Sequence, residues 1–330
     1  MDFNYDVDTQ NFREVLLSLA SQVEKSAELV KSIQVDQRVT KVAILGMGGS
    51  ALPGEILKNY LKNDPIPVYV IRDFNVPNYL DKETLIFIIS YSGNTEETIS
   101  AYRKAVKIGA PIICISSGGK LEQLAQMYKS QYVKVPIVSQ PRLGIGYLFF
   151  TILEIMQRVH LISNRSDDVK STVRTLQKEI YESFAKELAQ KIGDKIPIIY
   201  AAQDLYAIAY LWKISFNENA KTMAFCNAVP ELDHNELSGY AGAKERFYTI
   251  LFKDVTGEDP RITKRIETLK EVIKETGNDA VEMAIRGENL LSKIFSAIYL
   301  GYWTSYYVAL MNNVDPTPVD VIESFKLKVK

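Results

Sequence analysis

Residues 85–98 read LIFIISYSGNTEET, which predicts a buried strand, a short hydroxyl-rich loop and the start of a helix. The first five residues are all apolar and show no polar alternation, which is typical of a strand covered on both faces in a parallel sheet. A helix should begin at Asn94 or Thr95, because two glutamates suit its first turn and apolar residues follow at helical spacing. The stretch therefore predicts one strand–loop–helix unit of an α/β fold.

The loop 90–95 suits a phosphate group. An anion at this helix start meets unpaired backbone N–H groups, the positive end of the helix dipole and neutral hydroxyl donors, so no lysine is needed. A second glycine loop, 46–50 (GMGGS), follows the apolar strand 41–45, and we expect both loops to face one cleft. An ordinary capped helix after a Ser/Gly loop remains the alternative. The expected phosphate-binding residues are Gly49, Ser50, Ser90, Ser92 and Thr95.

The first glycine loop has a second interpretation. Residues 46–51 also fit the relaxed dinucleotide fingerprint, and Asp73 follows about 20 residues later, where an acid would bind an adenosine ribose. An NAD-dependent dehydrogenase is therefore the competing enzyme class. The dehydrogenase interpretation gives the hydroxyl-rich loop 90–95 no role, whereas a single phosphate bound by loops 46–50 and 90–95 together explains both loops.

Composition limits the class of protein. The 330 residues are enough for two domains of about 150 residues each. Lys and Arg number 39 against 40 Asp and Glu, so we expect no nucleic acid partner. The start of the chain is acidic and no apolar run reaches about 18 residues, so we expect a cytoplasmic protein without a membrane partner. With two histidines we expect no metal site, and we expect Cys114 and Cys226 to be buried thiols and His160 a packed helix residue.

Strand and helix patterns alternate along the chain, which is typical of doubly wound parallel sheets. The alternation occurs twice, so we expect an α/β fold with two doubly wound parallel-sheet domains and flanking helices, divided into residues 1–155 and 156–330. The expected strands span residues 41–45, 68–71, 85–89, 112–115, 132–135, 196–201, 247–252 and 280–284. The expected helices include residues 9–33, 143–160, 169–188, 204–218 and 261–275.

Several motifs together resemble a known family. The loops 46–50 and 90–98 resemble the sugar isomerase (SIS) domain, a phosphosugar-binding unit. The segments 216–221 (FNENAK), 230–236 (PELDHNE) and 315–318 (DPTP) resemble the bifunctional phosphoglucose/phosphomannose isomerases and occur in the expected order. The resemblance implies two flavodoxin-like SIS domains and a homodimer. It also implies interconversion of glucose 6-phosphate or mannose 6-phosphate with fructose 6-phosphate through an enediolate, without a metal or other cofactor.

The resemblance also implies catalytic roles. Aldose–ketose isomerisation needs a base, an acid for ring opening and a positive group near the developing charge. By resemblance, Glu218 is the base, and His234, shared across the subunits of the dimer, opens the ring. Lys326 assists at the ring oxygen, and Arg142 stabilises the enediolate and joins the substrate-binding residues. A non-catalytic phosphosugar sensor is a further alternative, but it would carry an added DNA-binding module or lack the base, and this sequence shows neither feature.

Overall fold

The computed structural model describes residues 2–243 and 246–329, which form two compact units. The N-terminal unit comprises residues 18–173, and the C-terminal unit comprises the described residues of 1–17 and 174–330. This division differs from the expected one at 155/156. The boundary lies later in the chain, and the first 17 residues join the C-terminal unit instead of the N-terminal one.

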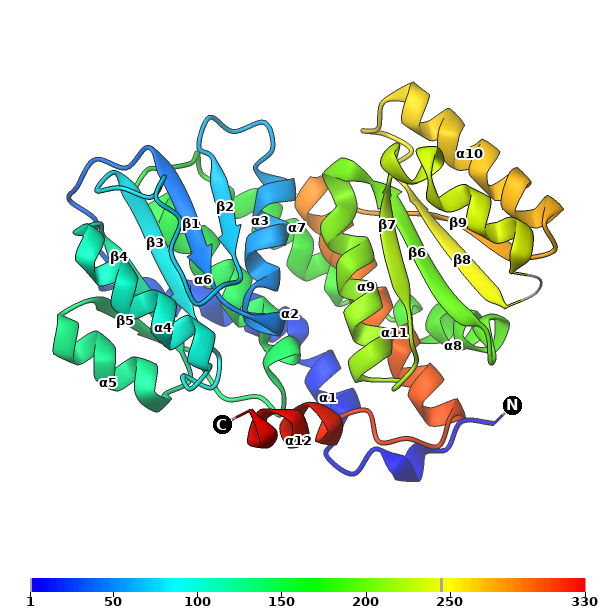
Figure 1. The fold of residues 1–330 in the computed structure, drawn as a ribbon, viewed down its shortest axis with the longest axis horizontal. Coiled ribbons are helices and arrows are strands. Elements are labelled where there is room, and N and C mark those ends of the chain that lie inside the picture. The colour runs from blue at the N-terminus through cyan, green and yellow to red at the C-terminus, as the bar shows by residue number, and fades with distance from the viewer. Residues whose placement is uncertain (1, 244–245, 330) are drawn as a thin grey trace. The chain divides into compact units, whose positions relative to one another are not determined.

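The N-terminal unit contains a parallel sheet in the strand order β2-β1-β3-β4-β5 (Figure 1). Each strand lies within one residue of its predicted position. The strands are β1 (Lys41–Leu45), β2 (Val68–Ile71), β3 (Thr84–Ile89), β4 (Ile112–Ser116) and β5 (Gln131–Lys134). The helices are α2 (Leu19–Ser26), α3 (Leu52–Tyr60), α4 (Glu96–Ala105), α5 (Gly119–Tyr128), α6 (Ile145–Arg158) and α7 (Ser166–Leu176), the last of which contains the boundary between the units.

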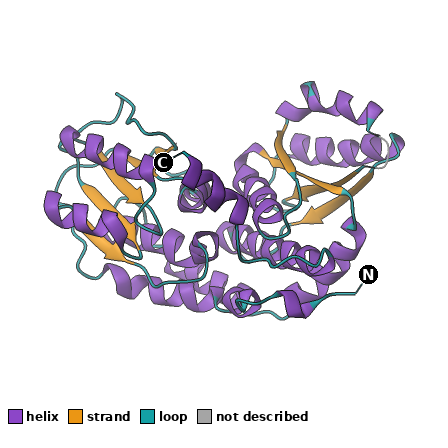
Figure 2. Ribbon diagram, turned by 60° about the horizontal axis from the view of Figure 1, so that its bottom comes forward, coloured by secondary structure: helices purple, strands orange, loops and turns teal. Residues whose placement is uncertain are grey.

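The core of this unit explains the apolar sequence of β3. Every residue of β3 is buried, as expected for a strand covered on both faces. On one face, Ala43 and Ile86 of the sheet share a cluster with Ile99 of α4 and Leu121 of α5. Figure 2 shows the strands of each unit lying between helices, so the predicted α/β layering is confirmed.

The C-terminal unit repeats this plan with the strand order β7-β6-β8-β9, again parallel. On one face, Ile266 and Ile273 of α10 pack against Leu251 of the sheet. On the other, Trp212 of α9 stacks edge-on against Phe252, with ring centroids 5.1 Å apart. The strands are β6 (Ile196–Ala202), β7 (Phe225–Val229), β8 (Phe247–Lys253) and β9 (Asp279–Ala284). The helices are α1 (Phe12–Leu17), α8 (Ile180–Ile192), α9 (Tyr206–Glu218), α10 (Pro260–Glu275), α11 (Leu290–Met311) and α12 (Asp320–Lys328).

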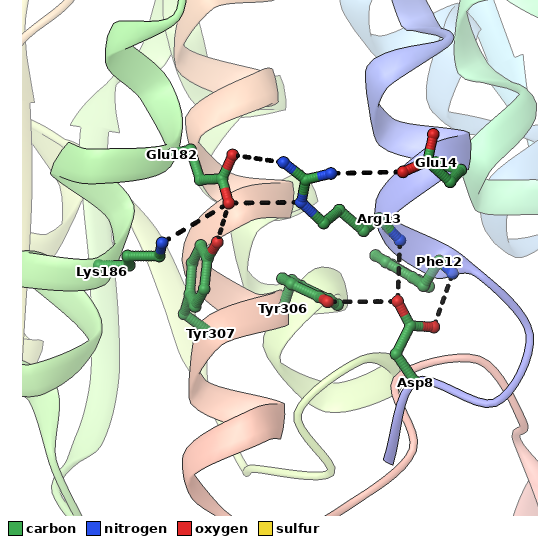
Figure 3. Close-up of polar contacts among 8 residues, drawn as sticks. All are labelled: Asp8, Phe12, Arg13, Glu14, Glu182, Lys186, Tyr306 and Tyr307. Atoms are coloured by element: carbon green, nitrogen blue, oxygen red, sulfur yellow. Dashed lines mark hydrogen bonds and ion pairs between the residues drawn. The ribbon is translucent and has the colours of Figure 1, made fainter. Parts of the chain in front are cut away.

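Polar contacts hold the first 17 residues in the C-terminal unit (Figure 3). Asp8 caps α1 by accepting hydrogen bonds from the N–H groups of Phe12 (2.7 Å) and Arg13 (3.1 Å), and it accepts another from Tyr306 of α11 (3.2 Å). The guanidinium of Arg13 donates to both oxygens of Glu182 on α8, at 3.3 and 3.0 Å. Such charge-assisted, two-point contacts fix orientation as well as distance.

Two predicted helices are wrong in detail. Residues 9–33 form no single helix, because α1 ends at Leu17 and α2 begins at Leu19, where the chain passes from one unit to the other. Residues 169–188 belong to two helices, α7 and α8, which are separated by residues 177–179. Among the described residues, no helix has the length and apolar character that crossing a bilayer requires.

Candidate functional site

The two predicted loops meet at one edge of the N-terminal sheet. The order β2-β1-β3-β4-β5 reverses direction between β1 and β3, and ligands of such sheets bind at this switch point beyond the carboxyl ends of the strands. Loop 46–50 follows β1 and loop 90–95 follows β3. The backbone N–H of Tyr91 donates a buried hydrogen bond to Oγ of Ser50 at 3.0 Å, so the loops are in direct contact.

The hydroxyl groups of loop 90–95 differ in their accessibility. Ser90 is fully buried, and its hydroxyl donates to Oγ1 of Thr95 at 2.9 Å. Thr95 is the N-cap residue of the ten-residue helix α4 and is half-buried. Ser92 is exposed. The accessible hydroxyls of Ser92 and Thr95 thus lie at a helix N-terminus, where N–H groups and the dipole favour an anion.

A third loop supports the hydroxyl-rich one. Gly93 has φ +70°, and a Cβ atom there would lie 1.8 Å from the carbonyl oxygen of Gly118, in the loop after β4. The side chain of Asn94 donates to the carbonyl of Ser92 at 3.0 Å and accepts from the N–H of Lys120 at 3.0 Å. Only glycine fits at position 93. Sequence reasoning missed this third loop, although residues 116–119 (SSGG) directly follow a predicted strand.

Arg142 lies against the first glycine loop. It belongs to the short 3₁₀ turn Pro141–Gly144, and only 2% of its surface is exposed. A Cβ atom on Gly49 would come within 3.0 Å of the Arg142 backbone nitrogen, so the loop can pack this closely only with glycine at that position. The structure therefore brings together all of the phosphate-binding candidates and Arg142.

The other three candidates lie on separate elements of the C-terminal unit. Glu218 is the last residue of α9 and is half-buried. His234 ends the 3₁₀ turn Glu231–His234 and is exposed. Lys326 lies on α12, where it is exposed and forms an ion pair with Glu323 at 2.7 Å.

The switch point of the C-terminal sheet, between β6 and β8, has different chemistry. Asp254 follows β8 directly, is 6% exposed and accepts a hydrogen bond from the ammonium of Lys293 at 2.7 Å. A buried carboxylate at this edge opposes binding of a phosphate dianion. The C-terminal unit also has a cavity of about 780 Å³ beside β7, which is lined in part by Tyr206, Phe225 and Glu236.

The structure also shows the positions of Asp73, His160 and the two cysteines, for which the sequence made predictions. Asp73 is exposed, and its carboxylate accepts hydrogen bonds from the backbone and side chain of Asn75, so it closes a local turn. His160 follows the end of α6 with φ +58° and is exposed, so its prediction as a packed helix residue is wrong. Cys114 is buried, as predicted, and burial raises its pKa to about 12, whereas Cys226 is only half-buried. The described residues hold no cluster of three His, Cys, Asp or Glu side chains that suits a metal ion.

Known proteins resemble both units. The SIS domain family matches residues 37–129, and the family of the bacterial phospho-glucose isomerase C-terminal SIS domain matches residues 181–329. A bifunctional phosphoglucose/phosphomannose isomerase of Caldicellulosiruptor bescii is 36% identical over 332 residues, which cover 96% of this chain and 98% of that protein. The chain belongs to the bifunctional phosphoglucose/phosphomannose isomerase family. The predicted family is therefore confirmed.

Two further similarities bear on this family assignment. A D-glucosamine-6-phosphate 4-epimerase of Sulfolobus acidocaldarius is 35% identical over 205 residues, which cover 61% of this chain and 64% of that protein. The C-terminal domain of glucosamine-fructose-6-phosphate aminotransferase from Francisella tularensis has the same fold, with a TM-score of 0.72 and 16% identity over 96% of this chain and all of that one. The two-domain SIS fold thus also occurs outside the bifunctional isomerase family.

Proposed function

We propose that this protein interconverts glucose 6-phosphate and mannose 6-phosphate with fructose 6-phosphate, without a metal or other cofactor. The observation that carries the proposal is the 36% identity to a bifunctional phosphoglucose/phosphomannose isomerase over 96% of the chain. The loops after β1 and β3 support it, because their hydroxyl and N–H groups suit the phosphate that all three sugars carry.

The phosphate is assigned to the N-terminal unit. The hydroxyl groups of Ser92 and Thr95 donate hydrogen bonds to the phosphate, and Gly49 and Ser50 of the first loop complete the phosphate site. Ser90 is buried and acts chiefly by orienting Thr95, to which it donates at 2.9 Å. Hydrogen bonds to a charged group contribute about 1.5–3 kcal/mol each, so a few of them hold the ester firmly without a salt bridge.

The proton transfer is assigned to Glu218. Its carboxylate removes the proton from C2 of the open-chain aldose. The electron pair of that C–H bond forms the C1–C2 double bond while the π pair of the C1 carbonyl moves onto O1, which gives the enediolate. Protonation at C1, with transfer of the hydroxyl proton from O2 to O1, then gives the ketose. Arg142 stabilises the enediolate charge, because a guanidinium fixed in a closed site needs little reorganisation during the reaction.

Ring opening is assigned to His234 and Lys326. An imidazole exchanges a proton with the ring oxygen near neutral pH, and an ammonium assists at the same oxygen. We assign His234 to the site of the neighbouring subunit in a homodimer. The exposure of His234 on its short turn supports this assignment, since the side chain is accessible to a second chain.

Replacement of the base tests the proposal. Glu218→Gln keeps the size and hydrogen-bonding capacity of the side chain but removes the base, so turnover of fructose 6-phosphate should fall by at least about a hundredfold. Binding of the phosphosugar should change little. Glu187→Gln, at an exposed position of α8, is the matched control and should keep full activity. Substantial turnover by Glu218→Gln would remove Glu218 as the base, and turnover of glucosamine 6-phosphate alone would point to the epimerase reaction.

Two further experiments test the cofactor and the shared histidine. Exhaustive chelation should leave the rate unchanged, and a loss that zinc restores would overturn the metal-free assignment. Mixed dimers of His234→Ala and Glu218→Gln chains should recover part of the activity, since one of their two sites would be intact. Demonstrated heterodimers without activity would place His234 in the site of its own chain.

A further inference from the structure

The chain turns back on itself immediately after Glu218. The last carbonyl groups of an α-helix lack partners within the helix, and α9 ends at Glu218. Asn219 is fully buried, and its side chain donates to Oγ of Ser305 on α11 at 2.9 Å. Two residues later, Lys221 has φ +53°, an uncommon conformation for a residue with a side chain.

The ammonium of Lys221 is directed at backbone carbonyl groups. It donates to the carbonyl oxygens of Glu218 at 3.0 Å, Asn219 at 3.3 Å and Asp315 at 2.5 Å. An ammonium group has three protons to donate, and each of these bonds is charge-assisted. Lys221 therefore connects the end of α9 with a segment 94 residues further along the chain.

The distant end of this connection is itself held. The side chain of Asp315 accepts hydrogen bonds from the N–H of Thr317 at 2.8 Å and from the hydroxyl of Thr9 at 2.5 Å. Asn312 donates to Oγ1 of Thr222, the residue after Lys221, at 3.2 Å. The turn that contains Asp315 thus gives Lys221 a fixed point against which to hold the backbone of Glu218.

We propose that Lys221 is a positioning residue for the base Glu218. The proposal rests on the function proposed above. Its ammonium fixes the carbonyl of Glu218, and with it the direction in which the carboxylate leaves the end of α9. The left-handed backbone of Lys221 belongs to this device, because it folds the chain back so that the side chain reaches carbonyls two and three residues earlier. Strained conformations of this kind persist where surrounding contacts fix them, and they cluster at functional sites.

A purely stabilising role predicts different behaviour. A lysine at a helix C-terminus also interacts favourably with the helix dipole, and its loss would then lower only the amount of folded protein. A positioning role changes the chemical step instead, since a displacement of about 1 Å in a catalytic group can reduce the rate by about a hundredfold. Kinetic constants per folded molecule separate the two roles.

Lys221→Met tests the proposal, with Lys129→Met as the matched control. Like Lys221, Lys129 is an exposed lysine with positive φ (+55°) at the end of a helix, but it is the C-cap residue of α5 in the N-terminal unit. Lys221→Met should lower kcat by about tenfold or more while the KM for fructose 6-phosphate changes less than about twofold. Lys221→Arg, which keeps a charged donor, should recover most of the loss, and Lys129→Met should behave like the unmodified protein.

The deuterium isotope effect supplies a readout that folding alone does not move. With glucose 6-phosphate deuterated at C2, the isotope effect on kcat should increase in Lys221→Met, because proton transfer becomes more rate-limiting. An unchanged isotope effect, or a kcat within twofold of the unmodified protein, would overturn the positioning role. Glu218→Gln measured in the same series keeps the two proposals distinguishable: if it is inactive while Lys221→Met is fully active, only the role of Lys221 fails.

Discussion

Ser50 is expected both to bind the phosphosugar and to stabilise the fold, and Ser50→Ala tests both roles through the free energy of unfolding and the affinity for the phosphosugar. Ser50 is 5% exposed, and its hydroxyl oxygen accepts the buried N–H of Tyr91 at 3.0 Å. Alanine at this position leaves that N–H without an acceptor, which costs about 1–3 kcal/mol of the free energy of unfolding. Loss of the hydroxyl from the phosphate site should also weaken phosphosugar binding by about tenfold or more, the effect of one charge-assisted hydrogen bond.

Ser92→Ala is the matched control because the same hydroxyl is removed from an exposed position. The hydroxyl of Ser92 accepts only a long hydrogen bond, 3.3 Å from the N–H of Asn94, so stability should change by less than about 0.5 kcal/mol. Binding should nevertheless weaken about as much as in Ser50→Ala. Ser50→Ala is thus expected to be less stable than Ser92→Ala, whereas the two variants should bind the phosphosugar with similar affinity.

The choice of probe matters for this comparison. Both tryptophans of the chain, Trp212 and Trp303, lie in the C-terminal unit, so their fluorescence does not report on the N-terminal unit directly. Urea unfolding followed by far-ultraviolet circular dichroism, together with hydrogen exchange of peptides that cover β1 and β3, measures the unit that changes. Equal stability of the two variants would refute the contribution of the Ser50–Tyr91 bond, and an unchanged KM in Ser92→Ala would refute the phosphate site.

Three other outcomes follow from the structure. Gly93→Ala should lower unfolding free energy by about 3 kcal/mol or more and raise the KM, because its Cβ would overlap the carbonyl oxygen of Gly118 at 1.8 Å; normal urea unfolding would contradict this. In an isolated helix, Gly301→Ala would add up to about 1 kcal/mol of stability. In this protein it should instead lower the free energy of unfolding by about 1–3 kcal/mol and shift tryptophan emission, since its Cβ would lie 2.5 Å from Nε1 of Trp212. Calorimetric titration with fructose 6-phosphate should give one site per chain; two sites per chain would contradict the assignment of the phosphate to the N-terminal unit alone.

The parts of the fold that the sequence predicts are those where local pattern and burial agree. β1 is found at residues 41–45, where the four consecutive apolar residues 42–45 predict a strand covered on both faces, and all four are buried. β7 has no such run. It is an edge strand whose exposure falls from Phe225 to the buried Val229, so its pattern is weak. The helix α11 was not predicted because it is buried on nearly all sides, so its sequence shows little of the apolar–polar contrast that marks a surface helix.

The break at Ser18 has no signal of its own. Apolar residues continue at helical spacing through the junction of α1 and α2, and the change becomes visible only from contacts at a distance. Asp8 is bound to Tyr306, and Arg13 is bound to Glu182, so the first helix belongs with residues far along the chain. Helical periodicity reports which face is buried but not which unit buries it.

The candidate site shows the same limit. Loops 46–50 and 90–95 could be placed together from sequence, because the carboxyl ends of neighbouring parallel strands meet at one edge of the sheet. The burial of Arg142 and its contact with Gly49 could not, since they depend on a turn that follows β5. The bond between Lys221 and Asp315 was equally hidden, because it joins a side chain to a backbone carbonyl 94 residues away.

The two units share the order of four strands but differ in the side chains at the switch point, and this difference fits the proposal of a single phosphate site per chain. In the N-terminal unit the switch point between β1 and β3 presents hydroxyl groups and a helix N-terminus. In the C-terminal unit the matching edge carries Asp254, and its charge is already balanced by Lys293 at 2.7 Å. A phosphate there would face a nearly buried carboxylate and compete for its only described ion-pair partner. The described contact at the end of α9, where Lys221 donates to the carbonyl of Glu218 at 3.0 Å, involves no phosphate-binding loop of this unit.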